Sequence, residues 1–124
     1  MNEYIRPKVE ELPQLIFDKE KAITNTRKLI SADERSLKFI EISIKKEISS
    51  EKALDTGKAV FSNEKSREEE LYVRKCSDDR HLQLEVNLED KKDDLDLKLR
   101  ELTLLFNELK VFKIVALMKS GGEI

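Results

Sequence analysis

Three residue types that bind metals or transfer protons lie close together near the middle of the sequence, as Cys76, Asp78, Asp79 and His81. Thiolate, imidazole and carboxylate groups are all ligands of transition metals. Structural zinc sites draw four ligands in paired spacings, whereas this sequence contains one cysteine and one histidine. We therefore predict that His81 lies in a solvated, charged turn of helix and that no metal is bound.

Four aspartates, Asp90, Asp93, Asp94 and Asp96, form an acidic run that invites comparison with calcium sites. A calcium-binding loop of the usual pattern needs a glycine inside it and a closing glutamate at a fixed distance, and both are missing. We interpret the run as the exposed face of a helix.

Catalytic sets are also missing from the sequence. One histidine and one cysteine supply no Ser-His-Asp or Cys-His arrangement with a supporting motif, and Gly57-Lys58 lacks the preceding glycine of a phosphate-binding loop. Catalysis needs a concave apolar pocket, for which a thin helical hairpin has little room. We expect a protein that is not an enzyme, with no catalytic residue and no cofactor.

The composition indicates which elements carry these residues. Of 124 residues, 40% are charged and 39% hydrophobic, with three glycines and two prolines, a balance typical of long helices. A β-sandwich or barrel would need turn residues roughly every 8–12 positions, and a disulfide scaffold would need paired cysteines. We predict one all-α domain spanning residues 1–124.

The break between helices is predicted from Asp55-Thr56-Gly57, since both prolines lie in the first 13 residues. We expect a helix over about 14–54, a connection over 55–62 and a helix over about 63–118, which together form an antiparallel hairpin. A short strand near 58–61 is an alternative within the connection.

The glycine of the break, Gly57, is placed to adopt the left-handed conformation after a helix C-terminus. Either Ser62 or Asn63 can cap the second helix, and Ser66 with Glu69 matches a capping box.

The first helix carries one apolar residue every seven positions. The intervening d positions of this heptad are mostly polar, as at Lys19, Thr26 and Asp33, while Leu15, Ala22 and Leu29 widen the stripe. A strict two-stranded coiled coil has apolar residues at both positions, so we expect a helix that lays one apolar edge on its neighbours in a bundle. The apolar positions are Ile16, Ile23, Ile30, Leu37 and Ile44.

The second helix has two apolar sides, which need two neighbours. We therefore predict a homo-oligomer, a dimer or higher, with the tightest burial from residue 102 onward and Phe106 at its centre. The first side comprises Leu88, Leu95, Leu99, Leu102, Phe106 and Leu109. The second side comprises Leu82, Val86, Leu97, Leu104 and Val111.

Residues 81–88 and 95–99 alternate between apolar and polar types, which is also the signal of a half-buried strand. The alternating residues are leucine and charged types rather than β-branched ones, and no Gly or Pro separates the two segments. These features favour helix, although the alternation alone leaves both structures open.

Charge is unevenly distributed along a chain whose net charge is −2. Residues 19–46 hold eight basic and four acidic side chains, while residues 76–101 hold five basic and nine acidic ones. The two stretches can attract each other across the hairpin, or the basic one can contact nucleic acid, with Phe39 or Tyr72 as stacking residues. Because the acidic face repels a nucleic-acid strand, we expect weak binding of single-stranded DNA at physiological salt. The candidate contacts are Lys21, Arg27, Lys28, Lys38 and Lys45.

The most apolar segment, 102–118, contains Asn107, Glu108, Lys110 and Lys113, which argues against a membrane span. The N-terminus has no charged segment followed by an apolar stretch, so the sequence does not predict a secretory signal. With a lone thiol, we expect a cytoplasmic protein without membrane contact.

Two resemblances extend this interpretation. Phe61, Ser62-Asn63-Glu64 and Arg67, followed by an Asp-Asp pair and a Leu/Glu-rich helix, resemble small helical proteins of phages and mobile elements, some encoded beside recombination or single-strand-annealing genes. The layout of helix, break and helix is similar to prefoldin subunits, whose second strand and apolar central segments have no counterpart here.

Three functional hypotheses follow from these observations. The first is a non-catalytic interaction or scaffold protein that self-associates and binds a protein partner. The alternative is a nucleic-acid-binding accessory factor in recombination or replication. The third is a prefoldin-like chaperone subunit.

Overall fold

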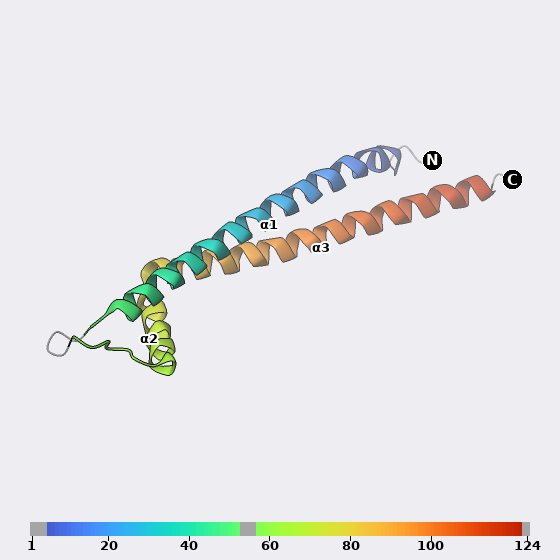
Figure 1. Cartoon of the computed structure of the whole chain (residues 1–124). Coiled ribbons are helices and arrows are strands. Elements are labelled where there is room, and N and C mark those ends of the chain that lie inside the picture. The colour runs from blue at the N-terminus through green and yellow to red at the C-terminus, as the bar shows by residue number, and fades with distance from the viewer. Residues whose placement is uncertain (1–4, 53–56, 123–124) are drawn as a thin grey trace. The chain divides into compact units, whose positions relative to one another are not determined.

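The computed structural model describes residues 5–52 and 57–122, and the side chains of residues 10–52 and 57–120. It contains three helices, α1 (Ile5–Ser50), α2 (Glu64–Ser77) and α3 (Asp79–Gly122) (Figure 1). Helix α1 packs against α3, which confirms the predicted all-α helical hairpin. Residues 81–88 and 95–99 both belong to α3, so helix prevails over the alternating pattern.

Helix α1 begins at Ile5, well before the expected start near residue 14, and Pro13 lies inside it. A proline in a helix interior cannot donate a hydrogen bond to the carbonyl four residues earlier. The helix nevertheless continues through this position, where the neighbouring Leu12 is only 2% exposed. Burial of an apolar side chain thus offsets the local preference against helix.

The C-terminal end of α1 lies at Ser50, four residues earlier than expected. There the carbonyl of Glu51 accepts a hydrogen bond from the Val60 amide at 3.1 Å, and Lys52 forms an isolated antiparallel bridge with Ala59. Because residues 51 and 52 pair with residues 59 and 60, the chain leaves the helical conformation here. In the described part of the connection, the expected short strand is reduced to this single bridge.

Gly57 has a φ of +65°, so its predicted left-handed conformation is confirmed. It lies in the chain reversal between the two bridged residues rather than directly after the end of α1. Residues 53–56, which we expected to end the first helix and begin the connection, lie outside the described residues.

The expectation of one continuous helix over 63–118 is wrong, because Asp78 separates α2 from α3. Asp78 has extended backbone angles, and its Oδ1 accepts hydrogen bonds from the amides of Arg80 at 2.9 Å and His81 at 3.2 Å. One carboxylate therefore satisfies donors that a continuing helix would bond to earlier carbonyls. Helix α3 then extends to Gly122, beyond the expected end at 118.

The start of α2 is capped by Asn63, whose side-chain oxygen accepts a hydrogen bond from the Ser66 amide at 2.7 Å. Asn63 is one of the two predicted caps. The Ser66 amide therefore donates a hydrogen bond to the cap residue, and Ser66 is not itself the N-cap of a capping box.

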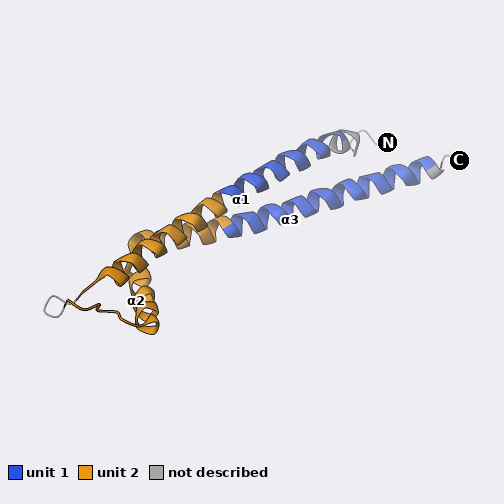
Figure 2. Cartoon of the chain, viewed as in Figure 1, with its two compact units in different colours: residues 1–28, 92–124 blue, residues 29–91 orange. Residues whose placement is uncertain are grey.

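The chain divides into two compact units, coloured separately in Figure 2. Unit 1 comprises residues 1–28 and 92–124, and unit 2 comprises residues 29–91. In unit 2, Lys75 of α2 forms an ion pair with Glu41 of α1 at 3.7 Å, and Arg74 of α2 forms one at 2.7 Å with Glu51, just after the end of α1. The core of unit 2 is an apolar cluster of Ile40, Ile44 and Ile48, onto which Phe61, Leu71 and Leu84 pack.

The described residues of unit 1 belong to α1 and α3, and the buried side chains among them all come from α1. Among the described residues from 102 onward, none is buried, and Phe106 is 47% exposed. The tightest burial therefore lies at Leu12 and Ile48 rather than in the C-terminal segment where we expected it. The buried residues of unit 1 are Leu12, Ile16, Ile23 and Thr26.

Candidate interaction surfaces

The residues with metal-binding or catalytic chemistry do not form a site. His81 is 4% exposed, which corrects the expected solvated turn, and its Nδ1 lies 3.2 Å from Glu85 Oε1 without the alignment of a hydrogen bond. Cys76 is exposed near the end of α2. Within residues 5–52 and 57–122, no three His, Cys, Asp or Glu side chains are grouped so that they could hold a metal ion.

Charged groups in unit 2 instead secure its helices. Hydrogen bonds from Arg74 to the carboxylates of Glu51 and Glu70, both at 2.7 Å, raise the pKa of the Arg74 guanidinium. The same guanidinium lies 5.7 Å from the centre of the Phe61 ring. At the α2–α3 break, hydrogen bonds from the Arg80 side chain and the His81 amide lower the pKa of the Asp78 carboxyl. These groups have structural roles at helix ends.

Polar d positions of α1 have polar partners on α3. In unit 1, Lys98 donates a hydrogen bond to the Thr26 hydroxyl at 2.8 Å and also binds Asp94 at 2.6 Å. In unit 2, Lys91 forms an ion pair with Asp33. Asp33 lies seven residues after Thr26 on α1, whereas its partner Lys91 lies seven residues before Lys98 on α3. The antiparallel register of the two helices therefore places these polar d positions next to their hydrogen-bonding and ion-pairing partners on α3.

A third polar contact, between Lys19 and Glu101 in unit 1, completes this set. The sequence pattern alone suggested that the polar d positions had no place at a helix–helix contact. Polar groups in such a seam specify register and orientation at some cost in stability. We refer to the contacts Lys19–Glu101, Thr26–Lys98 and Asp33–Lys91 as the polar seam pairs.

The predicted core residues differ in burial between the two long helices. On α1, four of five are buried and Leu37 is half-buried. On α3, Leu88 alone of the six is buried, Phe106 is exposed, and the others are half-buried. The buried set is Ile16, Ile23, Ile30, Ile44 and Leu88. The half-buried α3 residues are Leu95, Leu99, Leu102 and Leu109.

The second apolar side of α3 is exposed in the chain. We define the α3 stripe as Leu97, Leu104, Val111 and Met118, which are spaced by seven residues and are 54%, 66%, 56% and 70% exposed. All four lie in unit 1, and Ile114 and Leu117 beside them are also exposed. Four residues with the same heptad position lie on one side of a helix.

A groove in unit 1 brings this stripe together with α1. It is lined by apolar residues of both helices, and charged residues stand at its edges. Sequence reasoning assigned Leu15 and Ala22 to a widened stripe on the first helix, without linking them to the second helix. The lining residues are Leu15, Asp18, Lys19, Ala22, Glu101, Leu104 and Leu105.

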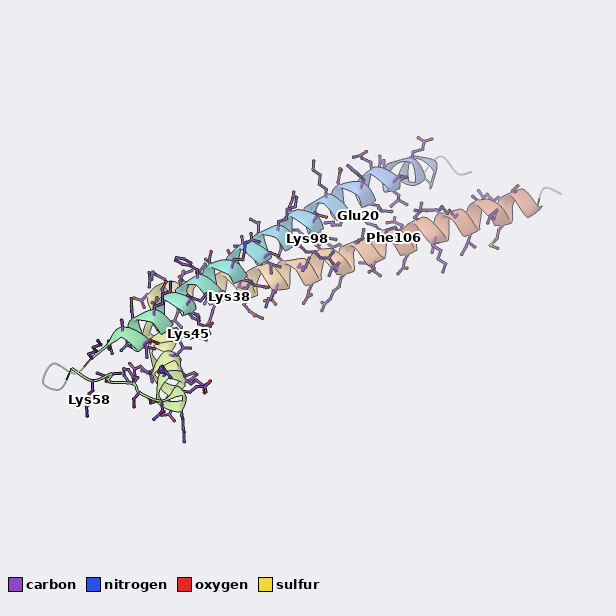
Figure 3. The ribbon with its side chains drawn as sticks, viewed as in Figure 1. Glu20, Lys38, Lys45, Lys58, Lys98 and Phe106 are labelled. Atoms are coloured by element: carbon purple, nitrogen blue, oxygen red, sulfur yellow. The ribbon has the colours of Figure 1, made fainter. Side chains whose placement is uncertain are left out.

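The predicted nucleic-acid contacts lie on α1 and are exposed, but they fall in both units. Lys21, Arg27 and Lys28 belong to unit 1, and Lys38 and Lys45 to unit 2. Lys45 forms an ion pair with Glu41 at 3.4 Å. Figure 3 shows Lys38 and Lys45 on α1, and Lys98 and Phe106 on α3.

By its fold and its surfaces, the chain is an all-α helical hairpin with an exposed apolar stripe on α3. No protein-family model, curated protein or solved structure matches the chain. None of the described helices is both long enough and apolar enough to cross a membrane.

Proposed function

We propose that this chain is a non-catalytic helical interaction protein that self-associates through unit 1. The observation that carries the proposal is the α3 stripe, four large apolar residues at seven-residue spacing that are each more than half exposed. A seven-residue apolar repeat is the pattern by which helices pack along their length. The stripe therefore has the spacing of a helix-packing surface that α1 does not cover.

The size of the apolar surface supports a second copy as its occupant. The four stripe residues, with Ile114 and Leu117, would remove on the order of 600 Å² from water at roughly 100 Å² each. This is comparable to the largest apolar patches of ordinary monomers and approaches the roughly 800 Å² per partner of a standard interface. Pairing of the groove-lining residues Leu15 and Ala22 with a second copy would add to this area.

The pattern also explains why a scaffold role fits better than catalysis. Long helices that pack in a bundle present extended surfaces to partners, whereas the two grooves described on the chain are shallow and are lined by no histidine or cysteine. In this proposal unit 1 joins copies of the chain through helix–helix packing of the coiled-coil type. Unit 2 remains available to bind a partner.

The experiment compares L104E/V111E with a matched control, K113E, which makes the same change of −2 in charge at an exposed position of α3 outside the stripe. We expect the wild-type protein to have at least twice the 14.5 kDa mass of one chain at micromolar concentration by light scattering. The double variant should shift to the monomer and retain its helical circular dichroism, while K113E should keep the wild-type mass. A wild-type mass of 14.5 kDa over this concentration range would refute the proposal.

A further inference from the structure

The outward side of α1 in unit 2 carries a net positive charge. Nine residues occupy the b, c and f positions of the heptad between residues 31 and 49, facing away from the buried seam. Four of the nine are basic and none is acidic. We call this set the basic face. It comprises Ser31, Ala32, Arg35, Lys38, Phe39, Ile42, Lys45, Lys46 and Ser49.

Most of the positive charge on the basic face is available to a partner. Arg35, Lys38 and Lys46 are exposed, and no carboxylate in the described part of the chain lies within ion-pairing distance of them. Lys45 is paired with Glu41 at 3.4 Å, and so contributes less. At 1.5 Å per residue, Arg35 and Lys46 are about 16 Å apart along the helix axis. This length is enough for several phosphates of a nucleic-acid strand.

An aromatic ring lies among these cations. Phe39 is 71% exposed, and a shallow hollow beside it is lined by Ala32, Arg35 and Ser36. Ile42, 43% exposed, lies beside a second hollow with Lys45 and Lys46. An exposed ring bordered by cations can stack on a base while the cations neutralise the neighbouring phosphates.

Other occupants fit the basic face less well. Phe39 and Ile42 are the only large apolar side chains in the set, too few for the apolar face of a membrane-bound helix. A second copy presenting the same face would place cations against cations, whereas the α3 stripe has uncharged residues throughout. The acidic run that we expected to repel nucleic acid contributes only Asp90 to unit 2, because 93–96 belong to unit 1.

We propose that the basic face of unit 2 binds single-stranded nucleic acid, with Arg35, Lys38 and Lys46 contacting phosphates and Phe39 stacking on a base. Of the five nucleic-acid contacts predicted from the sequence, this surface retains Lys38 and gives Lys45 a minor role. It does not include Lys21, Arg27 and Lys28. It adds Arg35 and Lys46. The proposal is independent of self-association, which uses different residues.

The test is fluorescence anisotropy of a labelled 20-nucleotide polythymidine strand in 50 mM NaCl. Two variants, K38E/K46E and F39A, are compared with matched controls on α1 in unit 1, K21E/K28E and F17A, in which Phe17 is 62% exposed. We expect the charge reversal to weaken binding at least tenfold and F39A to weaken it about five- to tenfold, within the range for loss of one stacked base. Both controls should stay within about twofold of wild type.

Two further measurements make the outcome decisive. The sequence contains no tryptophan, so F39W introduces a single reporter whose fluorescence should be quenched when bases stack on it. With about three phosphate contacts, log affinity should fall with log salt at a slope near −2.

The proposal is overturned if wild type does not bind at 10 µM protein, or if the unit 1 variants lose affinity equally. It is also overturned if F39A and F39W give no effect and heparin competes as well as the oligonucleotide, which would indicate an acidic polymer or protein as the partner. Light scattering on the same samples shows whether self-association persists in each variant.

Discussion

The two units solve the same packing problem with different numbers of elements. In unit 2, α1, α2, α3 and the connection all contribute apolar side chains to one cluster around Ile40, Ile44 and Ile48. In unit 1, the described segments of α1 and α3 pack only against each other, and none of the α3 residues 92–120 is buried. Two helices can bury one stripe each, so any second stripe needs a third element. In unit 2, α2 is a third helix and adds Leu71 to the cluster, whereas the described part of unit 1 contains no third element.

The largest expected effect comes from removing the centre of the unit 2 cluster. Ile48 is 1% exposed, so Ile48→Ala should lower the free energy of unfolding by about 2–5 kcal/mol through lost burial and a residual cavity. Urea denaturation followed by circular dichroism measures this.

The matched change in unit 1, Leu104→Ala, removes a 66% exposed side chain. Its cost should be small at low protein concentration and grow with concentration if a second copy covers it. Equal costs for the two variants at low protein concentration would contradict the contrast between the units.

An intermediate effect is expected at the polar seam pair of unit 2. Asp33 and Lys91 are partly buried, so Asp33→Ala should cost about 1–3 kcal/mol by leaving the ammonium without its partner. Replacing both residues by leucine should recover most of this loss, because a well-packed apolar pair can match an ion pair in stability. A double-mutant cycle from urea denaturation gives the coupling energy. Additive single effects would show that the pair is not coupled.

The smallest effect concerns the α2–α3 break and depends on pH. The pKa of Asp78 is lowered in the folded chain, so its contribution to stability is present above the ordinary carboxyl value, about 3.9, and is lost as the pH falls through the lower folded value. Asp78→Ala should therefore melt below wild type at pH 7, and the difference in melting temperature should shrink as the pH falls toward 2. Asp90→Ala, at an exposed position of α3 away from the break, serves as the control for loss of an aspartate from this helix. A constant difference for Asp78→Ala would show that its cap does not depend on the charge.

Sequence reasoning predicted the fold class, the existence of the hairpin and the seam on α1, because apolar residues every seven positions have few other interpretations. It also gave Asn63 as one of two candidate caps and predicted that Gly57 is left-handed. It missed the α2–α3 break, although Ser77-Asp78-Asp79 is a cluster of residues that favour helix N-caps. The charged residues around it gave no change in apolar period that would mark a boundary.

The polar seam pairs could not be deduced from either helix separately. Lysine at residue 91 or 98 is an ordinary surface residue until the register of the hairpin places it beside Asp33 or Thr26. The burial of His81 was missed for a related reason. The three residues before it, Asp78, Asp79 and Arg80, are charged, but the His81 side chain is buried, so its sequence neighbours did not indicate its surroundings.

The polar seam pairs also bear on the order in which the chain assembles in time. Their partners are separated by 58, 72 and 82 residues for Asp33–Lys91, Thr26–Lys98 and Lys19–Glu101. Bringing distant segments together costs chain entropy that rises only logarithmically with loop length, so most of that cost falls on the first closure. Once Asp33 and Lys91 have met, each later contact adds only a few residues from each helix. We expect pulse-labelling hydrogen exchange to detect protection in unit 2 first and in unit 1 afterwards. The α1 and α3 segments of unit 1 would then be the last parts to become protected during folding and the first to open.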